Sequence, residues 1–179
     1  MNISRNSLLV SCVLLLSLSA QAKAARAQDA ASHDHDKAHC DMIARGNKAM
    51  GFDAAKTTHH FTLSTAGGAI EVSANDSADS ASRDEIQQHL RHIAQKFKEG
   101  DFDIPMLVHD QVPPGVPVMT RLKDAITYEY VATERGARVE ISSANPDARS
   151  AIHDFLRFQI QEHQTGDPTV EISAPQKSH

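Results

Sequence analysis

Apolar residues recur with a period of two in two stretches of the chain, and each stretch turns back on itself. The first covers residues 59–72 and has its turn residues at 66–68, and the second covers residues 128–141 and turns at Arg135-Gly136. Strict alternation over a few residues on either side of a glycine-containing turn is typical of half-buried strands joined as a hairpin. The pattern therefore predicts two β-hairpins.

A helical period follows each hairpin. Apolar residues three and four apart predict a helix from about residue 83 to 98, which Gly100 ends. The same spacing predicts a second helix that begins at Asn145-Pro146, a good cap followed by a proline in the first turn. We expect Gly166 to stop this second helix.

Two further segments have weaker patterns. Residues 39–56 predict a short helix that is broken at Gly51. Residues 101–118 contain four prolines, which are incompatible with a regular helix interior. Because Met106-Leu107-Val108 is nevertheless apolar, we expect this segment to be a packed excursion rather than a loose linker.

The two hairpin-and-helix stretches align with each other as copies of one ββα unit. Repeat one spans about residues 57–101 and repeat two about 126–167, within a single domain at residues 39–168. Each unit has an apolar sheet face and an apolar helix stripe that must bury against each other. The sequence thus predicts an α+β fold: tandem ββα units that form a four-stranded antiparallel sheet with two helices on one face. A pseudo-twofold axis would make the helices antiparallel, while the strand order is not predicted.

The copies differ most informatively at histidines. The first copy has His59 and His89 where the second copy has Tyr128 and Phe155. The second copy has His163 where the first copy has Phe97. Side-chain phase directs His59 and His89 towards each other, and if the helices are antiparallel, His163 comes to the same end of the layer between helices and sheet. Neutral imidazoles from different elements are common ligands of zinc, copper and nickel. We therefore expect a site for a transition metal or a metal-containing cofactor at His59, His89 and His163, with His109 as a candidate fourth ligand.

The same pattern admits two other interpretations. The histidines can be polar members of the core in a small homodimeric module that binds a ligand or protein, with the surface around Phe158 as its interface. Alternatively, the protein is a hydrolase or lyase with His109 or His59 as general base, beside Asp110 or Glu129. The sequence contains no nucleophile elbow, zinc-protease helix motif or phosphate-binding loop, so it does not indicate an enzyme.

The remaining histidines carry less information. His153 lies near the start of the last helix, where we expect it to be exposed. A tract rich in histidine and aspartate at residues 33–41 attracts metals by its composition. It includes Cys40, which can be a metal ligand, an intermolecular bridge or an unpaired thiol.

The N-terminus has the pattern of an export signal. Arg5 precedes an apolar run at residues 8–18 and a small-residue cleavage site, which predicts a signal peptide at 1–27 and a periplasmic or secreted location. Residues 28–38 are expected to be a disordered leader and residues 169–179 a flexible tail.

Net charge narrows the range of partners. Removing the signal peptide takes away Arg5, Lys23 and Arg26 and no acidic residue, so the formal charge changes from −5 to −8. This charge argues against nucleic acid and against an anionic membrane as partners, and it leaves a homodimer open.

Five short motifs together support a family resemblance. They are residues 50–53, residues 56–61, residues 108–115, residues 155–160 and residues 163–167. On the basis of these motifs, residues from about 40 to 168 of the sequence resemble a family of small exported bacterial proteins of unknown function. Some members carry the label aspartate carbamoyltransferase, but the Ser-Thr-Arg-Thr phosphate-binding run of carbamoyltransferases is absent here. The resemblance implies an exported domain and supplies neither an activity nor a ligand.

Overall fold

The structure, a computed structural model, describes residue 37 and residues 40–171. The chain divides into two compact units, residues 1–40 and 41–179, and the description below concerns the second. The predicted signal peptide and almost all of the predicted leader and tail lie outside the described residues. Within the described part, no helix combines the length and apolar character that crossing a membrane requires.

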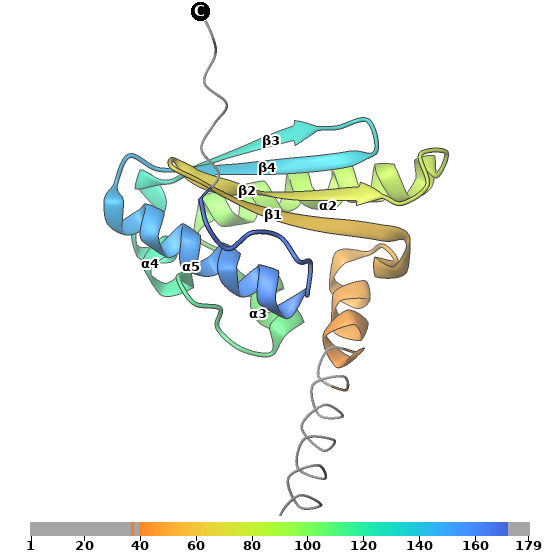
Figure 1. Cartoon of the computed structure of the whole chain (residues 1–179), viewed down its shortest axis with the longest axis horizontal. Helices are drawn as coiled ribbons and strands as arrows, with labels where there is room; N and C mark the ends of the chain where they lie inside the picture. The colour runs from red at the N-terminus through yellow and green to blue at the C-terminus, as the bar shows by residue number, and fades with distance from the viewer. Residues whose placement is uncertain (1–36, 38–39, 172–179) are drawn as a thin grey trace, which may run out of the picture. The chain divides into compact units, whose positions relative to one another are not determined.

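The second unit is an α+β domain with a four-stranded antiparallel sheet, as the alternating pattern predicts (Figure 1). Residues 41–50 are helical, and a bend at Gly51 follows, which confirms the predicted break. The later elements are η1 (Ala54–Lys56), β1 (Thr57–Ser64), β2 (Gly67–Ala74), α2 (Ser80–Glu99), α3 (Asp103–His109), α4 (Val116–Arg121), η2 (Lys123–Ala125), β3 (Thr127–Ala132), β4 (Gly136–Ser142) and α5 (Pro146–Glu162).

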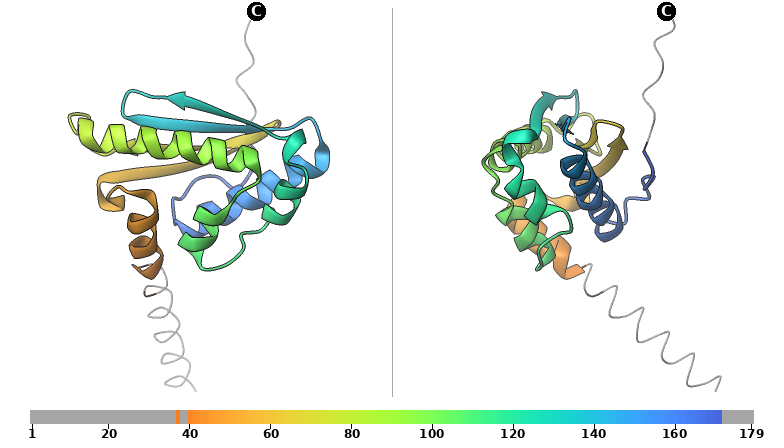
Figure 2. Two further views of the ribbon diagram at one scale, coloured as in Figure 1. Left: turned by 180° about the vertical axis from the view of Figure 1, so that it is seen from behind. Right: turned by 90° about the vertical axis from the view of Figure 1, so that its left-hand side faces the viewer.

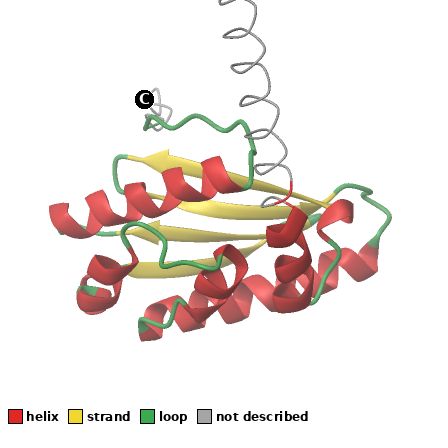
Figure 3. Cartoon of the chain, turned by 90° about the horizontal axis from the view of Figure 1, so that it is seen from below, coloured by secondary structure: helices red, strands yellow, loops and turns green. Residues whose placement is uncertain are grey.

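The sheet has the strand order β1-β2-β4-β3, so the second strands of the two hairpins pair at its centre. Ile70 of β2 lies opposite Val139 of β4, and both are buried. The inward positions of the strands are mostly apolar, and the outward positions carry polar side chains such as Glu71 and Arg138, which form an ion pair. Seen from below, the helices lie in front of the four strands, which places them on one face (Figure 3).

Each long helix covers mainly the strands of the other repeat. Helix α2 follows the first hairpin but packs chiefly on β4 and β3, whereas α5 follows the second hairpin and packs on β2 and β1. The two helices run in opposite directions, in agreement with the pseudo-twofold axis (Figures 1 and 2). The space between them, over the central strands, is where the two copies meet.

The helix ends agree with the sequence at the start of α5 and at the end of α2, whereas α2 begins at Ser80, earlier than the predicted residue 83. Asp79 and Asn145 cap the starts of α2 and α5 through their side chains, and Gly100 ends α2 in the left-handed conformation. The predicted stop at Gly166 is wrong, because α5 ends at Glu162. Here Gln164 adopts the left-handed conformation at φ 51°, and the next N–H bonds back to the carbonyl of Ile160.

The inter-repeat segment corrects a second prediction. It is packed, with Val108 and Val116 buried, but it contains two short helices where the prolines suggested none. Pro105 and Pro117 fall in the first turns of α3 and α4, where a backbone N–H has no partner within the helix. Proline therefore costs these helices no internal hydrogen bond.

The first hairpin also turns earlier than expected. Its turn consists of residues 65–66, and Gly67 begins strand β2. A Cβ atom at Gly67 would overlap the carbonyl oxygen of Ile141 on β4. This glycine therefore allows close approach of the central strands rather than forming the turn.

Candidate functional site

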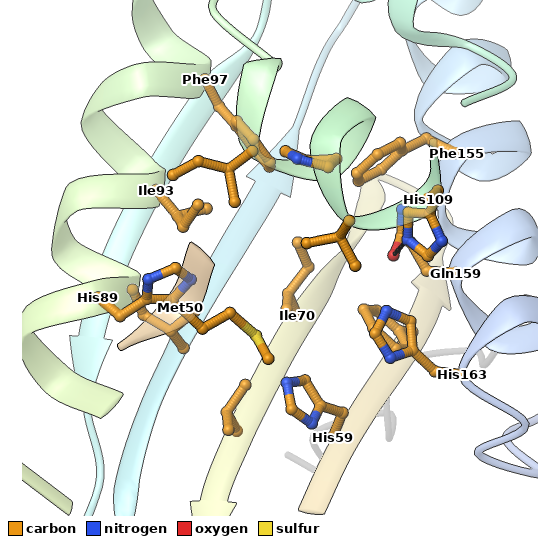
Figure 4. Close-up of a pocket in the computed structure, with 16 residues that line it drawn as sticks. Met50, His59, Ile70, His89, Ile93, Phe97, His109, Phe155, Gln159 and His163 are labelled. Carbon is orange, nitrogen blue, oxygen red and sulfur yellow. Dashed lines mark hydrogen bonds between the residues drawn. The ribbon is translucent and has the colours of Figure 1, made fainter. Parts of the chain in front are cut away.

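A pocket of about 520 Å³, including its open mouth, lies between α2 and α5 above the central strands (Figure 4). Helix α3 and Met50 complete its wall. Eleven of its sixteen lining residues are apolar, and none carries a carboxylate, ammonium or guanidinium group. The polar lining residues are His59, His89, His109, Gln159 and His163. All four histidines singled out in the sequence thus line the same pocket, which we call the histidine pocket.

Local structure explains how each imidazole reaches the pocket. His59 shares the inward face of β1 with Phe61, and His89 lies on the same side of α2 as the buried Ile93. His163 is the C-cap of α5, and His109 is the last residue of α3. Two of the four therefore depend on a helix terminus, whose position is set by tertiary packing.

Three of the imidazoles form a continuous cluster. The rings of His59 and His163 stack with their centroids 5.4 Å apart and an interplanar angle of 18°. The ring of His109 meets that of His163 edge-on at 5.2 Å. His89 joins the group through Phe52, whose ring lies 5.4 Å from His89 and 6.1 Å from His59. His163 is thus the central member.

The imidazoles do not surround a common point as they stand. Among the described residues, no group of three or more histidine, cysteine, aspartate or glutamate side chains is arranged to hold a metal ion. Cys40 is exposed and does not line the pocket. Any metal would therefore need ring rotation in the cluster or a ligand of another type.

Burial keeps the imidazoles of His59, His89 and His109 uncharged near neutral pH. Desolvation, with a smaller contribution from His60, lowers the pKa of His59 from 6.5 to about 4. Desolvation also lowers the pKa of His89 to about 4, and the neighbouring His59 and His92 add to the shift. Burial likewise lowers the pKa of His109, although its bond to Gln159 opposes the change. A neutral imidazole has one nitrogen with a lone pair available to a ligand.

His109 and Gln159 leave two buried polar atoms without a partner. His109 Nε2 lies 3.0 Å from Gln159 Oε1, and a proton on this nitrogen can be donated to the amide oxygen. The other ring nitrogen, Nδ1, has no hydrogen bond and lies 3.9 Å from Glu162 Oε2, and Gln159 Nε2 is also unpaired. Buried polar atoms without partners cost stability, so their presence beside a pocket is typical of a binding site.

Other residues proposed from sequence lie outside the pocket. Asp110 is exposed at the end of α3, and the side chain that hydrogen-bonds to His109 is Gln159 instead. Glu129 is exposed on β3. Phe158 is only partly exposed, because its ring packs against that of His109 with the centroids 4.9 Å apart.

The expected exposure of His153 is wrong. This residue is 7% exposed, and its Nε2 lies 3.0 Å from the carbonyl oxygen of Ser64. Because α5 crosses to the first hairpin, the start of the helix lies over the β1–β2 turn. The turn supplies the hydrogen-bond partner that a buried histidine needs.

Sequence reasoning missed two residues that shape the site. Gln159 shares one helix face with Phe155 and His163 at spacings of four, a signal that could have found it. Asp167 accepts a bond from the N–H of Phe61 at 2.9 Å and lies 2.9 Å from His60 Nδ1. This carboxylate fastens the segment after α5 to β1, close to His163.

Comparison of the chain with models of protein families, with curated proteins and with solved structures gives no match. The pocket must therefore be interpreted from its own chemistry. Its lining offers neutral nitrogens, one amide and one thioether, and it includes no hydroxyl, thiol or carboxylate group.

Proposed function

We propose that this protein is exported and binds a transition-metal ion in the histidine pocket. The observation that carries the proposal is that four imidazoles and the thioether of Met50 line one pocket that contains no carboxylate. Imidazole nitrogen suits zinc, copper and nickel, whereas magnesium, calcium and manganese require oxygen ligands. The N-terminal pattern of Arg5 and the apolar run at 8–18 supports export.

Ring separations in the cluster are compatible with shared coordination. Metal–nitrogen bonds of about 2.0–2.1 Å place the centroids of two imidazoles on one tetrahedral ion about 5 Å apart. The His59–His163 and His109–His163 separations are 5.4 and 5.2 Å. Coordination would require rotation of the rings. His163 belongs to both of these pairs, and we therefore assign it as the central ligand of the proposed site.

A second candidate ligand is a small, mostly apolar organic molecule. The predominantly apolar wall favours it, and the unpaired His109 Nδ1 and Gln159 Nε2 could hydrogen-bond to its polar group. Mass spectrometry of a denatured sample of metal-free protein tests this candidate. Detection of such a molecule, copurified with the protein, would favour it.

The metal proposal predicts a strong effect at His163. We expect tag-free protein to bind about one ion of zinc, copper or nickel per chain and His163→Ala to lose at least tenfold in affinity, because the central imidazole is removed. Equilibrium dialysis with elemental analysis measures both. His33, His35 and His39 are replaced by alanine throughout, so that the N-terminal tract does not contribute.

His60→Ala is the matched control, since this neighbour of His59 is exposed and does not line the pocket, and the bond from the N–H of Phe61 to Asp167 still holds the segment after α5. It should bind metal as the parent does. The proposal fails if the parent binds no metal, or if His163→Ala and His60→Ala bind equally well.

A further inference from the structure

We infer that the ion is copper in its monovalent state, Cu(I), held by the Met50 thioether together with the imidazoles of His59 and His163. This inference rests on the proposed function and names the metal and a ligand that the histidine pattern alone does not predict. Three properties of the histidine pocket support it: the softness of its donors, their number and its lack of charge.

Softness is the first argument. Met50 is half-buried, lines the histidine pocket and extends its sulfur between His89 and His59 in the view of Figure 4. Thioethers suit soft metals such as Cu(I), whereas the usual protein ligands of zinc are histidine, cysteine, aspartate and glutamate rather than methionine. Methionine is also a common filler of apolar cores, so its sulfur must be tested apart from its packing.

The number of ligands is the second argument. A structural zinc site uses four protein ligands and a catalytic one uses three, and these come from histidine, cysteine, aspartate and glutamate. No group of three such residues is in place in the described part of the chain. Cu(I) has a filled d shell and is satisfied by two or three soft ligands. The stacked pair His59–His163 with one thioether meets this lower requirement.

Charge is the third argument. No lining residue is anionic, and the carboxylate of Glu162, near His109, is 40% exposed and does not line the pocket. The cost of moving an ion into an apolar medium grows with the square of its charge. A divalent ion with neutral ligands therefore pays about four times the desolvation cost of a monovalent ion of similar size. The histidine pocket consequently favours Cu(I) over Zn²⁺, Ni²⁺ and Cu²⁺.

The test compares two methionines. Met50→Leu keeps the apolar volume and removes only the sulfur, while Met106→Leu does the same at a half-buried methionine that does not line the pocket. Both are made with Cys40→Ser and with alanine at His33, His35 and His39, so that neither the exposed thiol nor the N-terminal tract binds copper. Anaerobic competition with a chromophoric Cu(I) chelator gives the affinity, and a zinc-responsive dye gives that for Zn²⁺.

We expect Met50→Leu to weaken Cu(I) binding at least tenfold, with Zn²⁺ binding unchanged and Met106→Leu equal to the parent. X-ray absorption should show one sulfur neighbour of copper that Met50→Leu removes. The inference is overturned if Met50→Leu retains Cu(I) affinity, or if Zn²⁺ binds more tightly than Cu(I). In either case, metal binding that still depends on His163 leaves the proposed function standing. If no metal binding depends on His163, both fail.

Discussion

Replacing Gly115 with alanine should lower the free energy of unfolding by about 4 kcal/mol or more, which is as large as the effect of severe substitutions in a protein core. Gly115 precedes α4 with φ 83°. A Cβ atom there would overlap the carbonyl oxygen of Ala151 and lie 3.2 Å from the amide nitrogen of Phe155, both on the backbone of α5. Because the obstacle is backbone, no change of rotamer relieves it. The positive φ adds about 1–2 kcal/mol of strain.

The Gly115 substitution should also disturb the histidine pocket. If α4 cannot approach α5, the segment that carries α3 must move, and His109 moves with it. Gly166→Ala is the matched control, because Gly166 has φ 73° but nothing within 4 Å of its Cβ position. Urea unfolding of both variants should give a loss of only about 1 kcal/mol for Gly166→Ala. Equal losses would show that the contact with α5 does not constrain Gly115.

Acid should destabilise the metal-free protein between pH 6.5 and pH 4. The pKa values of His59 and His89 are about 4 in the folded protein, against 6.5 as the ordinary value. Below pH 6.5 the unfolded chain binds protons that the folded domain excludes, so stability is complete above that pH and declines towards pH 4. A shift of this size corresponds to about 3 kcal/mol for each group. The combined loss of stability for His59 and His89 is smaller than twice this value, because the imidazole of His59 contributes to the lowered pKa of His89.

Urea unfolding at pH 7.5, 5.5 and 4.5 measures this loss. His89→Phe, which introduces the aromatic residue of the other repeat, should remove part of the pH dependence. His92→Gln changes an exposed residue of the same helix and should alter the profile much less than His89→Phe, because His92 makes the smallest contribution to the lowered pKa of His89. A profile unaffected by His89→Phe would show that other groups cause the acid sensitivity.

Local periodicity was sufficient to predict the sheet, both long helices and the inward phase of His59. These features follow from side-chain alternation and helical spacing within one segment. The gathering of the four histidines was partly predictable, since the repeat alignment marks His59, His89 and His163 as departures from aromatic positions. The mutual geometry of the rings depends on how α5 lies over the first hairpin, which no local pattern contains.

The missed features share a long-range cause. Asp167 accepts a hydrogen bond from Phe61 of β1, more than one hundred residues earlier in the chain. A glycine is needed at position 115 because the backbone of α5, which comes later in the chain, passes too close for a Cβ atom. His153 is buried because a distant turn offers it a carbonyl group. Tertiary contacts determine the environment of each of these residues, and the residue preferences within a short stretch of sequence carry no information about such contacts.

The exchange of helices between the repeats has a consequence for folding kinetics. The central ladder joins Gly67 to Ser142, and α2 finds most of its apolar contacts on strands that follow it in the chain. Before the second copy is available, the first ββα copy can form its hairpin but leaves most of the apolar face of α2 exposed, and closing so long a loop carries an entropy cost. Chains dominated by such non-local contacts fold slowly and in a concerted manner. For a domain assembled this way, stable packing of α2 depends on the C-terminal half of the chain.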